Sequence, residues 1–203
     1  MVINNKKDNK QRKPIHNDQM IYSMGDLKEM GYSYYLIGKL VSEGKLNKLN
    51  SSFFENSNYS GEISDFFYVS AFVPRGVICL MSAARYYDLT TYWPEGVDVA
   101  IDRDSKVGKL PDIPQINIVF FSEKRFSSGV VTVKSGKNVF RIYDVEKTVV
   151  DVLFYRNKIG IEETKEILTN YLKREDRDLK KLHRYAKELR CGKILSTYLE
   201  VLV

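Results

Sequence analysis

The sequence predicts an α+β fold, in which helices and a small sheet come from different stretches of the chain. Four short runs rich in β-branched and aromatic residues lie between residues 97 and 143, as strands require. After residue 143, apolar residues recur at helical spacing to the end of the chain. The 203 residues are 43% hydrophobic and 12% aromatic, so the chain can bury a substantial core.

The first 19 residues are basic and offer little to bury. The cations outnumber the two acids, Asp8 and Asp18; they are Lys6, Lys7, Lys10, Arg12 and Lys13. Such a segment is either a solvated tail or a basic arm that contacts phosphates once DNA is bound. The net charge of +6 agrees with polyanionic partners without proving them.

Residues 20–55 have the order short helix, turn, helix, hairpin. A short amphipathic segment covers 24–30, and Ser33 is placed to cap a second helix at 34–42. Alternating residues at 46–49 and 53–55 predict a small hairpin. This order is typical of a winged helix-turn-helix, so residues 1–60 are predicted to form a DNA-binding domain with a basic N-terminal arm.

The second of these helices is predicted to expose a face that could enter a DNA groove. Apolar periodicity turns Ile37 and its neighbours inward and leaves Tyr34, Tyr35, Gly38 and Lys39 outside. Two further cations, at the positions where a wing meets the DNA backbone, are Lys45 and Lys48. Winged modules also serve in protein interaction or purely structural roles, and that alternative remains open here.

A second domain is predicted over residues 65–203, after a polar linker at 56–62. Residues 65–72 suit a short helix or a buried strand, with the helix preferred, and residues 77–89 suit a helix. The predicted strands cover 97–101, 117–121, 130–133 and 139–143. Helix, strands and then helices indicate a mixed α/β domain with a small sheet.

The stretch from residue 140 to residue 160 is predicted to be the spine of this second domain. Asp144 follows the last strand and is placed to cap a helix, with Glu146 in the first turn. Lys147 occupies the third helical position, so the cap is a simple one and not a capping box. The helix is apolar over most of its surface, which predicts a core helix.

Three amphipathic helices are predicted after the spine. Ile161 begins the apolar stripe of the first, Leu179 begins that of the second, and Gly192 is expected to end the second. The second helix carries a basic stripe opposite its apolar residues, formed by Arg177, Lys180, Arg184 and Lys187. Such a stripe is either a solvated face or a docking surface for an acidic partner or nucleic acid.

Signals for catalysis are weak. His16 and His183 have no candidate nucleophile near them in sequence, and the sequence has neither a phosphate-cradling glycine loop nor Cys/His metal spacing. One cluster could hold a divalent metal as in metal-dependent nucleases, although a charged loop is the commoner explanation; it comprises Asp98, Asp102, Asp104 and Lys106.

Two cysteines, Cys79 and Cys191, lie far apart in apolar surroundings and are predicted to be buried free thiols. The polar N-terminus does not suit a signal peptide. No apolar run approaches the roughly 20 residues of a membrane span. We therefore expect a cytoplasmic protein without a membrane partner.

The chain resembles the AbiEi family of antitoxins from type IV toxin–antitoxin systems over nearly its whole length. The first half carries the resemblance in MGDLKEMGYSYYLIGKLVSEGKL and RGVICLMSAARYYDLT. The second half carries it in IYDVEKTVVDVLFYRNKIG, YLKREDRDLKKLHRYAKELR and the final YLEVL. The spine and the helices after it are the more specific part, because the first segment is common among winged regulators.

The resemblance implies a non-enzymatic regulator without a cofactor or metal. Its winged domain would bind repeats in its own promoter and repress the operon. The C-terminal domain would neutralise a nucleotidyltransferase-like toxin, without a stable complex being assumed. The positions that match DNA contact are Ser33, Tyr34, Tyr35 and Lys39, with Lys45 and Lys48 in the wing. For antitoxicity the sequence offers only a candidate surface, the basic stripe.

Overall fold

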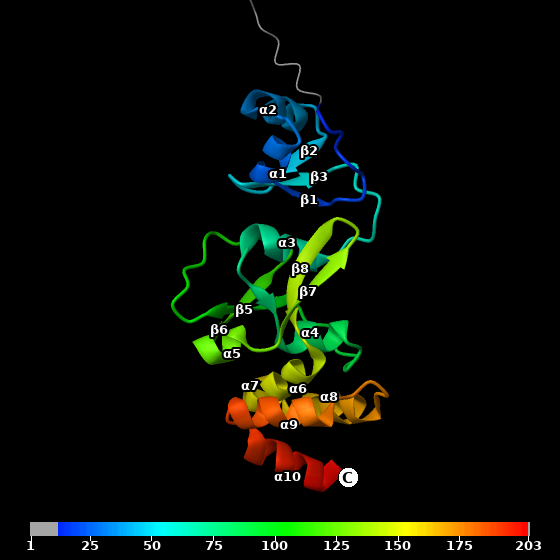
Figure 1. Ribbon diagram of the computed structural model, residues 1–203, viewed down its shortest axis with the longest axis vertical. Coiled ribbons are helices and arrows are strands. Elements are labelled where there is room, and N and C mark those ends of the chain that lie inside the picture. The colour runs from blue at the N-terminus through cyan, green and yellow to red at the C-terminus, as the bar shows by residue number, and fades with distance from the viewer. Residues whose placement is uncertain (1–11, 203) are drawn as a thin grey trace, which may run out of the picture.

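The computed structural model describes residues 12–202 and has an elongated shape with three tiers (Figure 1). A small sheet with two helices forms one end, a larger sheet lies in the middle, and a layer of helices forms the other end. The predicted mixture of helices and small sheets is confirmed. No helix within residues 12–202 combines the length and apolar character needed to cross a bilayer.

The first tier is a three-stranded antiparallel sheet covered by two helices. Ser23 begins the first helix through a reciprocal capping box, in which Asp26 N–H donates to Ser23 Oγ and Ser23 N–H donates to the Asp26 carboxylate. The sheet order is β1-β3-β2, and the elements are β1 (Ile21–Ser23), α1 (Met24–Glu29), α2 (Tyr34–Ser42), β2 (Leu46–Lys48) and β3 (Phe53–Asn56). The predicted helices and hairpin are confirmed, whereas β1 was not predicted.

The described end of the basic arm packs against this first tier. Lys13 N–H donates to Met30 O at 3.0 Å, and the Tyr32 hydroxyl donates to Lys13 O at 3.1 Å. Ile15 contacts the core of the tier. Residues 12–19 are therefore attached to the first tier, although most of their side chains are exposed. Lys6, Lys7 and Lys10 lie outside the described residues.

The second tier is a mixed five-stranded sheet with the order β6-β5-β4-β8-β7. Its elements are α3 (Asp65–Phe72), β4 (Val77–Ile78), α4 (Leu80–Tyr86), β5 (Val97–Asp102), β6 (Ile116–Phe121), α5 (Glu123–Ser127), β7 (Val130–Ser135) and β8 (Asn138–Tyr143). The four predicted strands and α3 are confirmed. The helix expected from residue 77 begins instead at Leu80, because Val77 and Ile78 are fully buried and pair with β5 and β8.

The predicted linker begins later than expected, because its first residue, Asn56, is the last residue of β3. Asn56 is buried, and its amide donates to the carbonyl oxygens of His16 and Gln19 at 2.9 and 3.0 Å. Across the junction, Met20 N–H donates to Asn138 Oδ1 at 2.7 Å. Met20 and Ile21 belong to the same hydrophobic core as the larger sheet and α3. The two sheets are thus joined through buried contacts.

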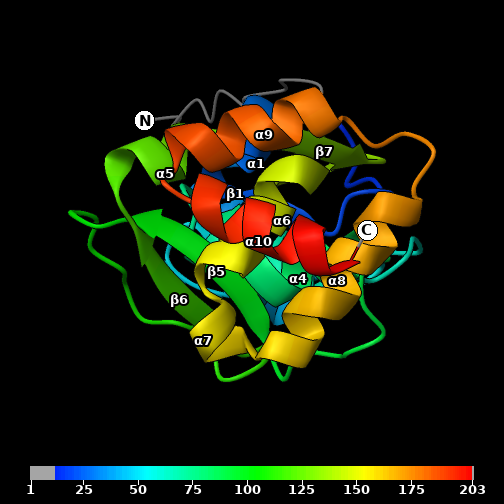
Figure 2. The same ribbon diagram turned by 90° about the horizontal axis from the view of Figure 1, so that it is seen from below.

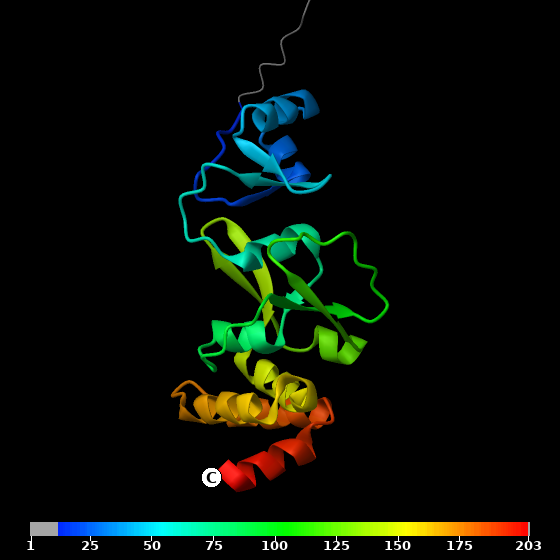
Figure 3. The ribbon, with the colours of Figure 1, turned by 180° about the vertical axis from the view of Figure 1, so that it is seen from behind.

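The third tier is a layer of helices around the predicted spine. Figure 2 views this layer from below, and Figure 3 shows it from behind at the end opposite α2. The helices are α6 (Val145–Phe154), α7 (Arg156–Ile159), α8 (Ile161–Lys173), α9 (Leu179–Glu188) and α10 (Gly192–Leu202). Asp144 caps α6 as predicted, since its carboxylate accepts from Lys147 N–H at 2.9 Å.

The spine is a core helix, as predicted, but three details of the following helices differ. Val149, Val150, Val152 and Leu153 on α6 are fully buried, whereas Phe154 at the end of this helix is exposed. Ile161 and Leu179 are exposed, because each is the first residue of its helix and the buried stripe begins a turn later. Gly192 starts α10 and does not end α9, which finishes at Glu188.

Candidate functional site

The exposed face of α2 is the surface that the sequence predicted for DNA contact. Ser33 caps the helix by accepting from Leu36 N–H at 3.4 Å. Tyr34 and Tyr35 are 65% and 80% exposed, whereas Ile37 is buried on the opposite side. Two large aromatic side chains in the first turn of an exposed helix face give it apolar contact area and hydroxyl groups.

Two of the cations on this surface share one carboxylate. Glu43 lies between Lys39 Nζ at 3.7 Å and Lys45 Nζ at 2.8 Å. The hydrogen bond from Lys45 lowers the pKa of Glu43, so its negative charge persists beside both lysines. Lys48 in β2 is exposed and has no ion-pair partner among residues 12–202. The full positive charge of this surface is therefore reduced near the end of α2.

Lys28 adds a cation that the sequence reasoning missed. Its ammonium lies 4.0 Å from the centre of the Tyr34 ring, and it donates to the Tyr34 hydroxyl. Lys28 belongs to α1, six positions before Tyr34, so the contact depends on how the two helices pack. No local pattern could have revealed it.

The predicted basic stripe on α9 is exposed along its length. Arg177, Lys180, Arg184 and Lys187 are all accessible, and none has an ion-pair partner in the part of the chain that is described. Arg177 precedes the helix, which begins at Leu179, and its guanidinium donates to Arg174 O at 2.7 Å. The stripe thus starts in the loop before α9 and continues along the helix.

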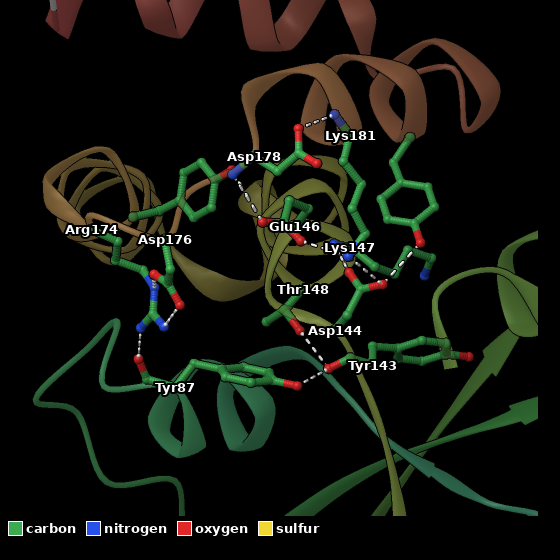
Figure 4. Close-up of polar contacts among 12 residues, drawn as sticks. Tyr87, Tyr143, Asp144, Glu146, Lys147, Thr148, Arg174, Asp176, Asp178 and Lys181 are labelled. Carbon is green, nitrogen blue, oxygen red and sulfur yellow. Dashed lines mark hydrogen bonds and ion pairs between the residues drawn. The ribbon is translucent and has the colours of Figure 1, made fainter. Parts of the chain in front are cut away.

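Lys181 shows how α9 is held so that the stripe faces outward. Its ammonium lies 3.0 Å from Glu146 and 3.2 Å from Asp144, both at the start of α6 (Figure 4). Burial lowers the pKa of Lys181, but the hydrogen bond with Glu146 and the charge of Asp144 outweigh it, so the net shift is upward. The Tyr185 hydroxyl also donates to Asp144 at 2.9 Å. These contacts attach one side of α9 to α6.

Glu146 completes this attachment. It is almost fully buried and accepts from Asp178 N–H at 3.3 Å and from the Tyr171 hydroxyl at 3.4 Å. One carboxylate thus contacts α8, the loop before α9 and α9 itself through Lys181. The sequence placed Glu146 only as a favourable charge in the first turn.

A buried charge triad lies deeper in the same region, and sequence reasoning missed it. The Asp151 carboxylate accepts from Lys147 on its own helix and from Arg125 on α5. Arg125 also donates to Leu189 O at 2.9 Å. Lys147 lies over the Tyr143 ring, with its ammonium 3.9 Å from the centre, and burial lowers its pKa. Each charge finds its partners inside the triad, as in structural ion-pair networks.

Only Asp98 lies apart in the acidic cluster considered for metal binding, whereas Asp102, Asp104 and Lys106 line one hollow at the end of β5. Asp98 accepts from Met81 N–H at 3.2 Å and from the Asn117 amide at 3.3 Å. Asp102 is four residues further along β5, about 13 Å away at the usual strand rise, and accepts from Asp104 N–H at 3.0 Å. Among the residues described, no group of three or more acidic, histidine or cysteine side chains could hold a metal. His16 and His183 are exposed and lie in different tiers.

Both cysteines are buried and free, as predicted. Burial raises the pKa of Cys191 to about 11, and it also raises the pKa of Cys79. A thiol that stays protonated at neutral pH is a poor nucleophile. Neither cysteine therefore points to catalysis.

No protein-family model and no curated protein matches the chain. Among solved structures, the chain is similar to the crystal structure of the RV2827C protein from Mycobacterium tuberculosis. The sequence identity is 13% and the TM-score is 0.46, and the match covers 91% of this chain and 76% of that chain.

Proposed function

We propose that this chain is an antitoxin of the AbiEi kind that acts by binding and not by catalysis. In this proposal, residues 1–60 form a winged helix-turn-helix that binds promoter repeats and represses the operon. The C-terminal part neutralises a nucleotidyltransferase-like toxin. The observation that carries the proposal is the presence of two cationic faces on different tiers, one on α2 and β2 and one on α9.

The order of elements in the first tier supports the DNA-binding half of the proposal. In a winged helix-turn-helix, the second helix enters the major groove and the hairpin contacts the backbone. Here α2 would present Tyr34, Tyr35 and Lys39 to the groove, and the β2–β3 hairpin would present Lys48 to a phosphate. Ser33, at the N-terminus of α2, is placed to meet a phosphate together with free backbone amides.

A salt titration tests this half. The full chain and the triple variant Lys39→Ala, Lys45→Ala, Lys48→Ala would be titrated onto labelled DNA from the chain's own promoter region. Each lysine that neutralises a phosphate adds about 0.9 to the slope of log K against log salt. We expect the triple variant to bind more weakly with a flatter slope. An unchanged affinity and slope would show that DNA does not contact this face.

The α9 stripe is the surface proposed for neutralisation. Its cations face outward while Lys181 and Tyr185 attach the helix to α6, so the stripe can be altered without disturbing the core. Charge reversal of Arg177, Lys180, Arg184 and Lys187 to glutamate should abolish rescue of cells that express the nucleotidyltransferase encoded beside this chain. Promoter binding should remain.

A matched control variant distinguishes an effect of the stripe on rescue from an effect of net charge. Reversing four other exposed lysines changes the total charge equally but leaves α9 intact; these are Lys106, Lys109, Lys124 and Lys134. Rescue by the control variant together with loss of rescue in the stripe variant supports the proposal. Rescue by both variants would show that the stripe is a solvated face with no role in neutralisation.

A further inference from the structure

A hollow of 840 Å³ lies in the second tier, away from both cationic faces. It is bounded by the start of α3, by one side of α4, and by the loops that precede β5 and β6. These segments are far apart in the sequence and meet only in the fold. The motifs and charge patterns of the sequence did not single out this hollow.

Large apolar side chains gather around the hollow and remain exposed. Trp93 is 74% exposed and Ile113 is 88% exposed, and Ile63 and Tyr86 are exposed on the same rim. Single exposed apolar residues are ordinary, but a contiguous group marks an interaction surface. Trp93 is also the single tryptophan of the chain, and tryptophan is one of the residues enriched among those that carry most of the binding energy at protein interfaces.

The Arg85 side chain packs against the Trp93 ring. The guanidinium carbon of Arg85 lies 4.8 Å from the centre of the indole ring, within the range of a cation–π contact. The Arg85 guanidinium also pairs with Asp88 at 3.3 Å. The indole ring is therefore held at the rim by α4, so it is presented to solvent as an ordered platform.

The charge of the rim is opposite to the charge of the whole chain. Arg85 is the one cation among the lining residues, whereas five exposed carboxylates surround it: Glu62, Asp65, Asp88, Glu95 and Asp112. The chain as a whole carries +6. A rim that carries both carboxylates and exposed apolar side chains favours a partner with the complementary pattern, because opposite surface potentials steer and orient association.

We propose that this hollow docks a segment of a partner protein that carries lysine or arginine side chains beside an apolar anchor. The anchor packs on Trp93 and Ile113, and the flanking cations face the carboxylates of the rim. The occupant is a polypeptide and not a nucleic acid, since the rim would repel phosphates. This site is independent of the DNA-binding and neutralisation surfaces proposed above.

A displayed random-peptide library tests the proposal on the full chain. Peptides would be selected on the wild-type chain alone, and the affinity of each selected peptide would then be measured on the wild-type chain and on Trp93→Ser. The matched control is Tyr92→Ser, which alters an exposed neighbouring aromatic residue that does not line the hollow. We expect selected peptides to combine basic and apolar residues. Labelled versions should lose about tenfold or more in affinity on Trp93→Ser, as for a central aromatic anchor, and little on Tyr92→Ser.

A second variant tests the charge separately. Glu62→Gln, Glu95→Gln and Asp112→Asn together should weaken the binding of the selected peptides and reduce the salt dependence of that binding. Selected peptides that are acidic, or that bind Trp93→Ser unchanged, would overturn the proposal. So would a concentration-dependent dimer in sedimentation that Trp93→Ser abolishes, because a second copy of the chain would then occupy the hollow.

Discussion

The ammonium group of Lys147 and the carboxylate of Asp151 form an ion pair that is closed off from solvent, since neither side chain has exposed surface. Arg125 supplies a second cation to the same carboxylate. One buried anion thus pairs with two buried cations, which leaves an excess of positive charge, and the three groups join α5 to the spine helix α6.

This imbalance predicts unequal effects of removing the partners. Asp151→Leu would leave two buried cations without an anion, so we expect it to lower the free energy of unfolding by about 3–5 kcal/mol. Lys147→Met leaves the Arg125–Asp151 pair intact and should cost less. Urea unfolding measures both. A larger loss for Lys147→Met than for Asp151→Leu would contradict this assignment of roles.

Glu43 should restrain DNA binding if α2 contacts DNA. Glu43→Gln removes the carboxylate that pairs with Lys39 and Lys45, so both lysines become available to phosphates. We expect tighter binding to promoter DNA and a steeper salt slope, by up to about 0.9 for each new phosphate contact. Fluorescence anisotropy with labelled DNA measures both quantities.

Glu29→Gln is the control for this experiment. Glu29 is exposed at the end of α1, and its substitution changes the net charge equally without freeing either lysine. If both variants strengthen binding to the same degree, the effect comes from net charge and not from the Glu43 contacts.

The contact between the first two tiers predicts the behaviour of a truncated chain. A fragment from Asp65 to Val203 keeps both larger cores but loses Met20 and Ile21, which pack into the core of the larger sheet. Burial of such a side chain stabilises a fold by about 1.5–3 kcal/mol. We therefore expect the fragment to fold with a lower free energy of unfolding than the full chain, as measured in urea.

Asn138→Ala in the full chain isolates the polar part of this contact. It removes the acceptor of the Met20 N–H while leaving both tiers present. A smaller loss of stability than in the fragment is expected. A fragment as stable as the full chain would mean that the apolar contacts of the first tier contribute little.

Asp144 should contribute to stability in two separable ways. Asp144→Ala removes the helix cap, worth about 0.5–2 kcal/mol, together with the contacts to Lys181 and Tyr185. Asp144→Asn keeps a good capping residue and loses only the charge. For a chain of this size, about 2–4 °C of melting temperature corresponds to 1 kcal/mol. We expect a clearly larger drop for the alanine variant, and equal drops would show that the charge outweighs the cap.

Local signals explain which elements could be predicted from the sequence. The side chains of Ser33 and Asp144 accept hydrogen bonds from backbone amides three residues later. The start of each helix can therefore be predicted from a few neighbouring residues. The pair Val77–Ile78 is different, because it becomes a strand only through pairing with segments that lie many residues further along. A two-residue central strand has no local pattern that distinguishes it from the start of a helix.

Among the charged residues, too, the sequence predicts the positions that depend on one helix alone but not those that depend on contacts between elements. The stripe on α9 could be predicted from the sequence, because its cations and the apolar residues recur at helical spacing on opposite sides of one helix. The sequence assigned Glu146 only a favourable charge in the first turn of the spine helix and Lys147 only a position in that turn, whereas both are buried against residues from other elements. The hollow around Trp93 draws its walls from four separate segments, so no single stretch could indicate it.

The elongated arrangement of the three tiers has a consequence for stoichiometry. The exposed face of α2 and the stripe on α9 lie near opposite ends of the long axis (Figures 1 and 3). A bulky ligand at one end therefore leaves the other end sterically open. If both proposed surfaces bind their partners, occupation of one does not block the other, so each partner should titrate the chain one to one whether or not the other partner is present.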